Sequence, residues 1–282
     1  MRSIHRIAWP MAAVAVLAAV PAMAQEARES HFNGVYVGVA GGATMQNHNS
    51  NRTLVFDRNG DGTYGDQVTT STGVNAFGPG YCGGAAQGAT PADGCSNGRA
   101  STFDYAARVG YDARLGRNVV AGVLFEANKN SARESVSGFS TTPASYTITR
   151  QLDYGLAARG RIGFTPNGGF LLYGTGGVTY AKLKHDFATT NTANAFSENR
   201  DGKMVWGWQA GGGGEIMLTN NVSLGLEYLY SRYRDNKYSV DVSQGTAPVT
   251  NPFVLGGGGT SIRPSDKNFN VQAVRASLNL QF

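Results

Sequence analysis

A run of acidic and amide side chains in the N-terminal third has the types and spacing for metal chemistry. Counted from Asp57, side-chain oxygens recur at positions 1, 3 and 5, a glycine at position 6 permits a sharp turn, and position 7 offers a backbone carbonyl. This is the first half of a calcium-binding loop. The expected ligands are Asp57, Asn59, Asp61, Thr63 and Asp66. Position 12 is Val68 instead of the usual glutamate, so Asp66 would have to replace that ligand; the alternative is a polar turn without metal.

Nucleophilic or acid–base catalysis finds little support. After residue 24 the histidines are His31, His48 and His185. None of them lies at a sequence spacing from a serine or an acid that is typical of a catalytic pair. The Gly211–Gly214 run is not followed by the Lys-Ser/Thr pair of a phosphate loop. We therefore expect no catalytic residues and no enzymatic activity.

The composition excludes several classes of protein. The chain has 282 residues with 39 glycines, 15% charged residues and a mean hydropathy of −0.25, and no apolar stretch reaches the about 20 residues of a membrane-spanning helix. The net charge is +5, or +3 without Arg2 and Arg6, and the basic residues are scattered. Nucleic-acid binding is therefore not expected.

The first 24 residues are predicted to be a cleaved export signal. Arg2 and Arg6 form the positive region, a short apolar stretch follows, and Ala22-Met23-Ala24 is the small-residue cleavage site. Residues 25–282 would then form one domain outside the cytoplasm, where thiols oxidise. Cys82 and Cys95 are accordingly expected to form a disulfide.

Most of the remaining sequence alternates apolar and polar residues with a period of two. Eight such segments are predicted as strands: 33–43, 101–115, 118–130, 146–164, 169–182, 204–218, 222–234 and 268–282. They are longer than the roughly 5 or 6 residues usual for soluble strands. Short turns join them at one end, and long polar stretches (44–100, 131–145, 183–203 and 235–267) join them at the other. This is typical of an all-β fold, an eight-stranded antiparallel transmembrane β-barrel of up-and-down topology, with 44–100 as a long first extracellular loop and both termini in the periplasm.

The polar face of these strands should line the barrel lumen. It carries six acids and five arginines, namely Asp104, Asp112, Glu126, Asp153, Glu215 and Glu227 with Arg108, Arg114, Arg159, Arg161 and Arg275. Because eight strands enclose a space that side chains just fill, we expect these charges to form a paired plug. The alternative is a narrow selective conduit, for which small lumen residues would leave room.

The opposite face should contact lipid. Aromatic residues gather near the predicted strand ends, with Trp206, Tyr180, Tyr146 and Tyr228 among those toward the outside, as in the interfacial girdles of barrels. The chain ends with apolar Leu278, Leu280 and Phe282 at alternate positions. That ending resembles the signature by which the outer-membrane assembly machinery recognises its substrates.

Two stretches carry a family resemblance. GFLLYGTGGVTY at 169–180 and GWQAGGGGEIMLTNNVSLGLEYLY at 207–230 resemble the opacity-like porin-family surface antigens of alphaproteobacteria, and 32–38 does so less closely. The resemblance implies a Gram-negative outer-membrane protein, surrounded by outer-membrane lipid and lipopolysaccharide and monomeric. It further implies a role in envelope integrity and in surface interaction with an extracellular partner that the sequence does not identify. The alternative is a narrow porin or a loop-mediated binder of a small, haem-like ligand.

Overall fold

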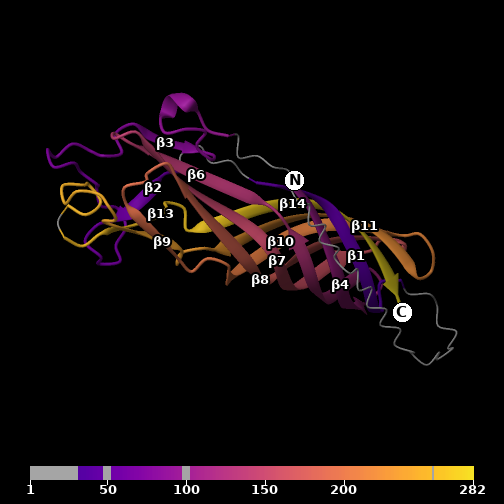
Figure 1. The fold of residues 1–282 in the computed structure, drawn as a ribbon. Coiled ribbons are helices and arrows are strands. Elements are labelled where there is room, and N and C mark those ends of the chain that lie inside the picture. Colours follow the sequence, from indigo (N-terminus) through magenta and orange to yellow (C-terminus); the bar gives the residue numbers. More distant parts are fainter. Residues whose placement is uncertain (1–30, 47–51, 97–101, 256) are drawn as a thin grey trace, which may run out of the picture.

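The computed structural model describes residues 31–46, 52–96, 102–255 and 257–282. Eight long strands form a closed antiparallel barrel in which each strand pairs with its neighbours along the chain, and β14 returns to β1 (Figure 1). They are β1 (Gly34–Met45), β4 (Thr102–Leu115), β5 (Val119–Asn130), β7 (Ala144–Phe164), β8 (Phe170–Thr189), β10 (Lys203–Met217), β11 (Val222–Arg234) and β14 (Asn268–Gln281). The predicted fold class and strand count are confirmed. Closure satisfies the backbone hydrogen bonds of every long strand, which a lipid environment demands.

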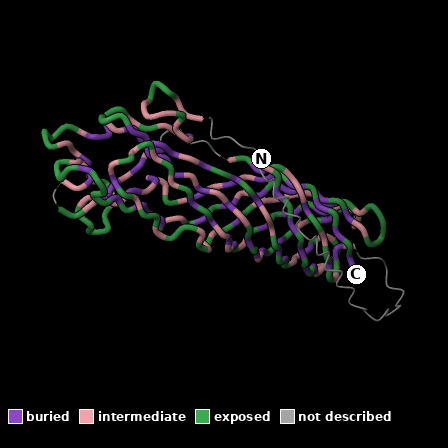
Figure 2. The backbone as a smooth tube through the Cα atoms, viewed as in Figure 1, coloured by how far each residue is buried: buried purple, intermediate pink, exposed green. Residues whose placement is uncertain are grey.

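Alternation along these strands separates two environments. Buried and exposed residues follow one another at single-residue spacing along the barrel (Figure 2). The outward positions are mostly apolar and exposed, as in Val39, Phe125 and Leu226 at 59%, 59% and 61%. Such residues would be unfavourable in water, so this surface suits lipid. None of the described residues belongs to a helix with the length and apolar character to cross a membrane.

The long connections fold into a head at the end of the barrel opposite the C-terminus (Figure 1). We use "head" for the short elements β2 (Leu54–Asp57), β3 (Gly80–Gly83), a 3₁₀ turn η1 (Pro91–Asp93), β6 (Arg133–Ser140), β9 (Ala195–Asn199), β12 (Ser239–Ser243) and β13 (Thr260–Pro264), with the strand ends and loops between them. β2, β13, β12 and β9 form a second, four-stranded sheet, while β6 and β3 extend the barrel sheet beyond β7. The sequence did not predict these strands, because each is short and lies in a stretch rich in Gly, Ser, Thr and Asn.

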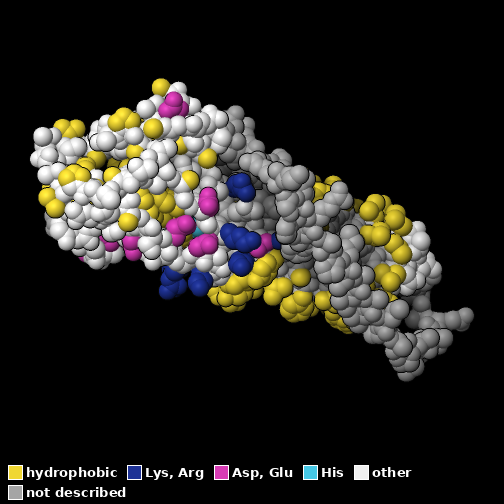
Figure 3. Space-filling view, viewed as in Figure 1, with side chains coloured by type: hydrophobic (Ala, Val, Ile, Leu, Met, Phe, Trp, Pro, Cys, Tyr) yellow, Lys and Arg dark blue, Asp and Glu magenta, His cyan; other side chains and the backbone are white. Residues whose placement is uncertain are grey.

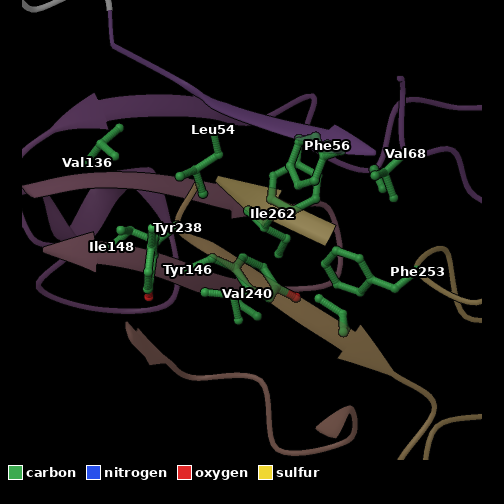
Figure 4. Packing of buried hydrophobic residues seen from close by; sticks show 14 residues of the cluster. Leu54, Phe56, Val68, Val136, Tyr146, Ile148, Tyr238, Val240, Phe253 and Ile262 are labelled. Atoms are coloured by element: carbon green, nitrogen blue, oxygen red, sulfur yellow. The ribbon is translucent and has the colours of Figure 1, made fainter. Parts of the chain in front are cut away.

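The head has its own apolar core. Phe56 and Val240 from the second sheet belong to one cluster with Tyr146 of β7 and Phe253 (Figure 4). Phe77 joins it, with its ring in contact with those of Phe56, Tyr146 and Phe253. The ring centroids of Phe56 and Phe77 are 4.4 Å apart and those of Tyr146 and Phe253 5.4 Å, distances at which aromatic pairs attract. Tyr146 is thus not part of the interfacial girdle, because β7 continues past the membrane boundary and buries this side chain in the head.

A disulfide joins Cys82 of β3 to Cys95, as expected from the sequence. β3 pairs with β6, where Cys82 lies opposite Ser137. The bond therefore ties the segment after β3 back to the edge of the sheet and restricts the unfolded states of this exposed part of the head.

Candidate functional site

The centre of the lumen holds a buried ion network. Glu126 of β5 receives Arg275 of β14 at 2.6 Å, Arg159 of β7 at 3.0 Å and Arg108 of β4 at 3.2 Å. Glu227 of β11 accepts a second bond from Arg159 at 3.0 Å and lies 3.5 Å from Arg108. The contacts of Arg108 and Arg159 with Glu126 join neighbouring strands, whereas Arg275 to Glu126 and both contacts of Glu227 span strands that are not sheet neighbours. The ions therefore link opposite walls of the barrel.

Two further groups complete this central cluster. Asp104 of β4 accepts a bond from Arg275 at 2.6 Å, and the hydroxyl of Tyr173 donates to Glu227 at 3.2 Å. With Asp104, three carboxylates therefore face three arginines, and every one of these six side chains is 0–2% exposed. Buried charges are tolerated when they are paired and hydrogen-bonded in this way.

A second cluster lies nearer the C-terminal end of the barrel. Arg161 of β7 donates to both Asp112 of β4 and Glu215 of β10, the latter at 3.0 Å. Its guanidinium also lies over the ring of Tyr36, 4.6 Å from the centroid. Two acids here share one arginine, and Glu215 receives an additional donor from the Asn279 amide at 3.0 Å. The neutral donors help to offset the excess negative charge.

Lumen glycines make room for these side chains instead of leaving a channel. A Cβ at Gly110 would lie 2.3 Å from Cζ of Tyr36, and one at Gly122 would lie 2.0 Å from Oδ1 of Asp112. Both distances are far below contact, so a larger residue would displace the plug. At these two positions the space that the sequence offered for a conduit is filled by the side chains of Tyr36 and Asp112.

Two residues predicted for the network lie elsewhere. Asp153 is on the outer surface, where it pairs with Lys129 and with Lys184, the latter at 2.7 Å. The pairing of β7 with β8 shifts between Leu152 and Gly155, and this bulge exchanges the two faces of β7. Strict alternation carried across the bulge therefore assigned Asp153 to the wrong side.

Arg114 is the other correction. It is half-buried near the end of β4, donates to the carbonyl of Arg117 at 3.0 Å in the turn that follows, and forms no ion pair with any residue the structure describes. It follows the inward parity of Asp112 and lies opposite Val120, but its guanidinium bonds to the turn and does not reach the acids of the lumen. The other nine predicted charges form the two clusters.

Apolar layers close the lumen on both sides of the ions. Toward the C-terminal end, Phe32 is fully buried with Val120 and Leu171. Toward the head, Leu183, Tyr233 and Phe269 form a second layer. Water and ions would have to cross two apolar barriers as well as the paired charges to pass along this barrel.

A buried polar chain that the sequence did not predict lies between the outer apolar layer and the head. Arg150 of β7 contacts Glu134 of β6 at 3.2 Å and Asp235 at 3.4 Å. Asp235 also accepts a bond from Nε2 of His185 at 3.0 Å, and the imidazole stacks on Tyr238 with centroids 3.9 Å apart. Burial raises the pKa of Asp235, but its bonds to His185 and Arg150 outweigh burial and hold it below its ordinary value.

His185 was expected to be an isolated loop residue, and that expectation was wrong. Strand β8 continues to Thr189 and pairs with β7 as far as Tyr146. Alternation of Leu183, His185 and Phe187 with the more polar residues between them could have extended the predicted strand. The carboxylate partner could not have been found, because it lies 50 residues further along the chain.

The predicted calcium residues form a tight turn after β2. Asp57 accepts the amides of Gly60 and Gly62, both at 2.8 Å, and Asp61 accepts that of Thr63 at 2.6 Å. Asn59 accepts the amide of Asp61 and donates to its carboxylate, and Asp66 accepts the amide of Arg58. Hydrogen bonding by Thr63 and Asn59 lowers the pKa of Asp61. Nowhere in the described ranges do three His, Cys, Asp or Glu side chains converge as a metal site, and calcium binding stays a prediction.

The ends of the outer face carry the predicted aromatic and C-terminal features. Trp206 is 64% exposed and its ring centroid lies 4.7 Å from that of Tyr180, on the side nearer the head. At the other end Leu278, Leu280 and Phe282 point outward with 48%, 42% and 61% exposure. Residues 1–30, with the predicted export signal, and His48 lie outside the described residues.

Comparison with known proteins gives consistent matches. The family model described as outer membrane protein beta-barrel domain matches residues 142–282. The 31 kDa outer-membrane immunogenic protein of Brucella melitensis biotype 1 is 32% identical over 124 residues, which cover 44% of this chain and 51% of that protein. The 22 kDa outer membrane protein of Rhizobium leguminosarum bv. viciae is 34% identical over 85 residues, 30% of this chain and 36% of that one. The chain spans about half the length of the curated Brucella relatives it matches. Among solved structures, OprG from Pseudomonas aeruginosa is similar at a TM-score of 0.45 and 14% identity, covering 91% of this chain and 100% of that chain.

Proposed function

The chain belongs to the family of outer-membrane proteins with a β-barrel domain, and from that membership we propose that it is a closed, non-enzymatic barrel that displays a folded head at the cell surface. One observation carries the proposal: nine buried charges and two apolar layers fill the lumen, while the connections at one end fold around a core of their own. The barrel then serves as an anchor that contributes to envelope integrity, and the head meets an extracellular partner.

The proposed orientation puts the head outside and the short turns in the periplasm. Long loops outside and short turns inside are the general pattern of such barrels. In this arrangement Leu278, Leu280 and Phe282 present the terminal strand to the assembly machinery from the periplasmic side, and the protein is a monomer in outer-membrane lipid. Proteolysis of intact cells tests the orientation: the head should be cut from outside, and cleavage confined to permeabilised cells would contradict it.

Planar-bilayer conductance of the refolded protein, residues 25–282, tests the closed barrel. Folding is verified first by the heat-dependent shift in gel mobility. We expect no single-channel steps, because Glu126 and its arginines block the axis and the apolar layers exclude water on both sides. Reproducible steps from folded protein would refute the closed barrel and favour a narrow porin. Enzymatic lipid modification is tested in overproducing cells, where an unchanged lipid A mass spectrum is expected.

The second proposed activity is capture of a small ligand by the loops, and a cavity among the loops could hold such a ligand. A cavity of about 690 Å³ opens in the head between the Asp57 turn, β12 and the start of β13, a size that suits small ligands. Asp241, Gln244 and Thr260 are among its lining residues, whereas His, Met, Cys and Tyr, the usual ligands of haem iron, are absent from the lining described. The lining of this cavity favours a polar ligand over haem, and Asp241→Asn with Gln244→Ala should leave any Soret shift in a haem titration unchanged.

A further inference from the structure

The barrel wall opens sideways where two neighbouring strands part. Pairing of β10 with β11 ends at Gly207 opposite Tyr233, although β10 stays paired with β8 as far as Lys203 and β11 stays paired with β14 as far as Arg234. The segments beyond these ends therefore diverge. A cavity of about 480 Å³ lies between them, lined by residues 203–206 on one side and 234–238 on the other.

This cleft is lined by cations without internal partners. Arg200, Lys203, Arg234 and Lys237 are all exposed, and none of them forms an ion pair with any residue the structure describes. Lys and Arg side chains gather where the polar head meets the apolar band of the barrel (Figure 3). Four unpaired positive charges around one hollow attract an anion with several negative charges.

Three of the acids near the cleft are hydrogen-bonded within the protein. Asp235, the one acid in the lining, is bonded to His185 and Arg150. At the rim, Asp201 accepts the backbone amide of His185 at 2.6 Å, and Glu198 accepts the hydroxyl of Tyr238 at 2.7 Å. The lining thus holds four cations against one acid, and that acid is already paired with Arg150.

Two observations indicate what kind of anion fits. Trp206 lines the same cleft and belongs to the aromatic girdle with Tyr180, so the opening faces the level of lipid headgroups. His185 lies at the cleft with its side chain only 2% exposed, and its Nδ1 has no hydrogen-bond partner among the described residues. With Nε2 donating to Asp235, the neutral ring leaves Nδ1 as a hydrogen-bond acceptor at the buried end of the hollow, which a hydroxyl group of a bound headgroup would satisfy.

We infer that this cleft binds the phosphorylated headgroup of an outer-leaflet lipid. The acyl chains would lie along the apolar outer face below Trp206, and the phosphates would reach Lys203 and Arg234, with Arg200 and Lys237 on the far side. Arginine forks suit phosphate oxygens, and each added basic group near an anionic lipid surface strengthens binding. The inference rests on the proposed orientation of the head, because phosphorylated lipid A occupies the leaflet on that side.

The test compares matched double variants of the refolded protein in detergent with EDTA. Native mass spectrometry measures the dissociation constant for bisphosphorylated lipid A, for the same lipid without phosphates, and for inorganic phosphate. Lys203→Gln with Arg234→Gln should weaken binding of the bisphosphorylated lipid about 30-fold, from about 1 kcal/mol for each basic group. The control, Arg117→Gln with Arg133→Gln, removes the same charge from exposed residues that do not line the cleft and should bind like the unchanged protein.

Three outcomes would overturn the inference. The two double variants could bind the bisphosphorylated lipid equally, or the unchanged protein could bind the lipid equally with and without its phosphates. Inorganic phosphate could also bind as tightly as the bisphosphorylated lipid, which would mean a site for free anions. Heat-dependent gel mobility shows that each variant is folded. The assay needs neither conductance nor a membrane orientation. Failure of lipid binding is therefore distinguishable from failure of the proposed closed barrel or of its orientation.

Discussion

Replacing Glu126 with glutamine should destabilise the barrel more than any exposed change of charge. The carboxylate has no exposed surface and contacts Arg275, Arg159 and Arg108 at 2.6, 3.0 and 3.2 Å. The central cluster holds three acids and three arginines, so the variant leaves a net positive charge buried among them. Breaking a buried ion pair from one side costs about 3 to 5 kcal/mol, because the remaining charge has lost its partner and cannot reach water.

The loss can be read from heat-modifiable gel mobility. At about 2 to 4 °C per kcal/mol for a domain of this size, the unfolding temperature of the variant should fall by about 6 to 20 °C. Asp186→Asn is the matched control, since it removes one negative charge from an exposed position on β8 and should change the temperature little. A second variant, Glu126→Gln with Arg159→Met, makes the cluster neutral again.

The energetic coupling between Glu126 and Arg159 decides whether charge pairing or packing accounts for the loss of stability. Glu126→Gln with Arg159→Met should be less destabilised than the sum of the two single variants, because each single change leaves an unpaired charge and the double change does not. If Glu126→Gln unfolds at the same temperature as Asp186→Asn, the network does not stabilise the barrel and the reasoning is refuted. Strict additivity would show that packing, and not charge pairing, accounts for the loss.

Three further predictions concern the head. Because the pKa of Asp235 is lowered in the folded protein, its stabilisation is complete above the unfolded value of about 3.9 and is lost as pH falls through the lower folded value; protease resistance of the head should drop there in the unchanged protein, and Asp235→Asn should remove that step. If the 57–66 turn binds calcium, the ion should slow proteolysis of this turn and EDTA should reverse the effect, whereas equal rates would exclude the site. Opening the disulfide with Cys82→Ser and Cys95→Ser should speed cleavage between β3 and β4 while leaving the unfolding temperature of the barrel nearly unchanged, and a large fall in that temperature would contradict the local role assigned to the bond.

The barrel could be predicted from the order of residue types alone. A strand places successive side chains on opposite faces. In the segment 222–234, leucines and tyrosines alternate with Ser, Gly and Glu, and this alternation predicts which face contacts lipid. Closure follows, since open sheet edges are not tolerated in lipid. The same parity placed Glu126 and Arg159 in the lumen, and the export signal predicted from the sequence led to the expected Cys82–Cys95 bond.

Only the tertiary structure shows register shifts and contacts between distant residues, because the alternation of apolar and polar residues does not specify them. The bulge between Leu152 and Gly155 reverses the parity of β7, and only the pairing with β8 reveals it, which is why Asp153 was misplaced. The core of the head joins Phe56 to Tyr146 and Phe253, residues about 90 and 200 positions apart, whose contacts no local pattern specifies. His185 gains its partner Asp235 in the same way, and the basic cleft exists only because β10 and β11 part after Gly207 and Tyr233. Side-chain period is a property of the local backbone and can be read from sequence, whereas register shifts and strand divergence depend on the neighbouring strand.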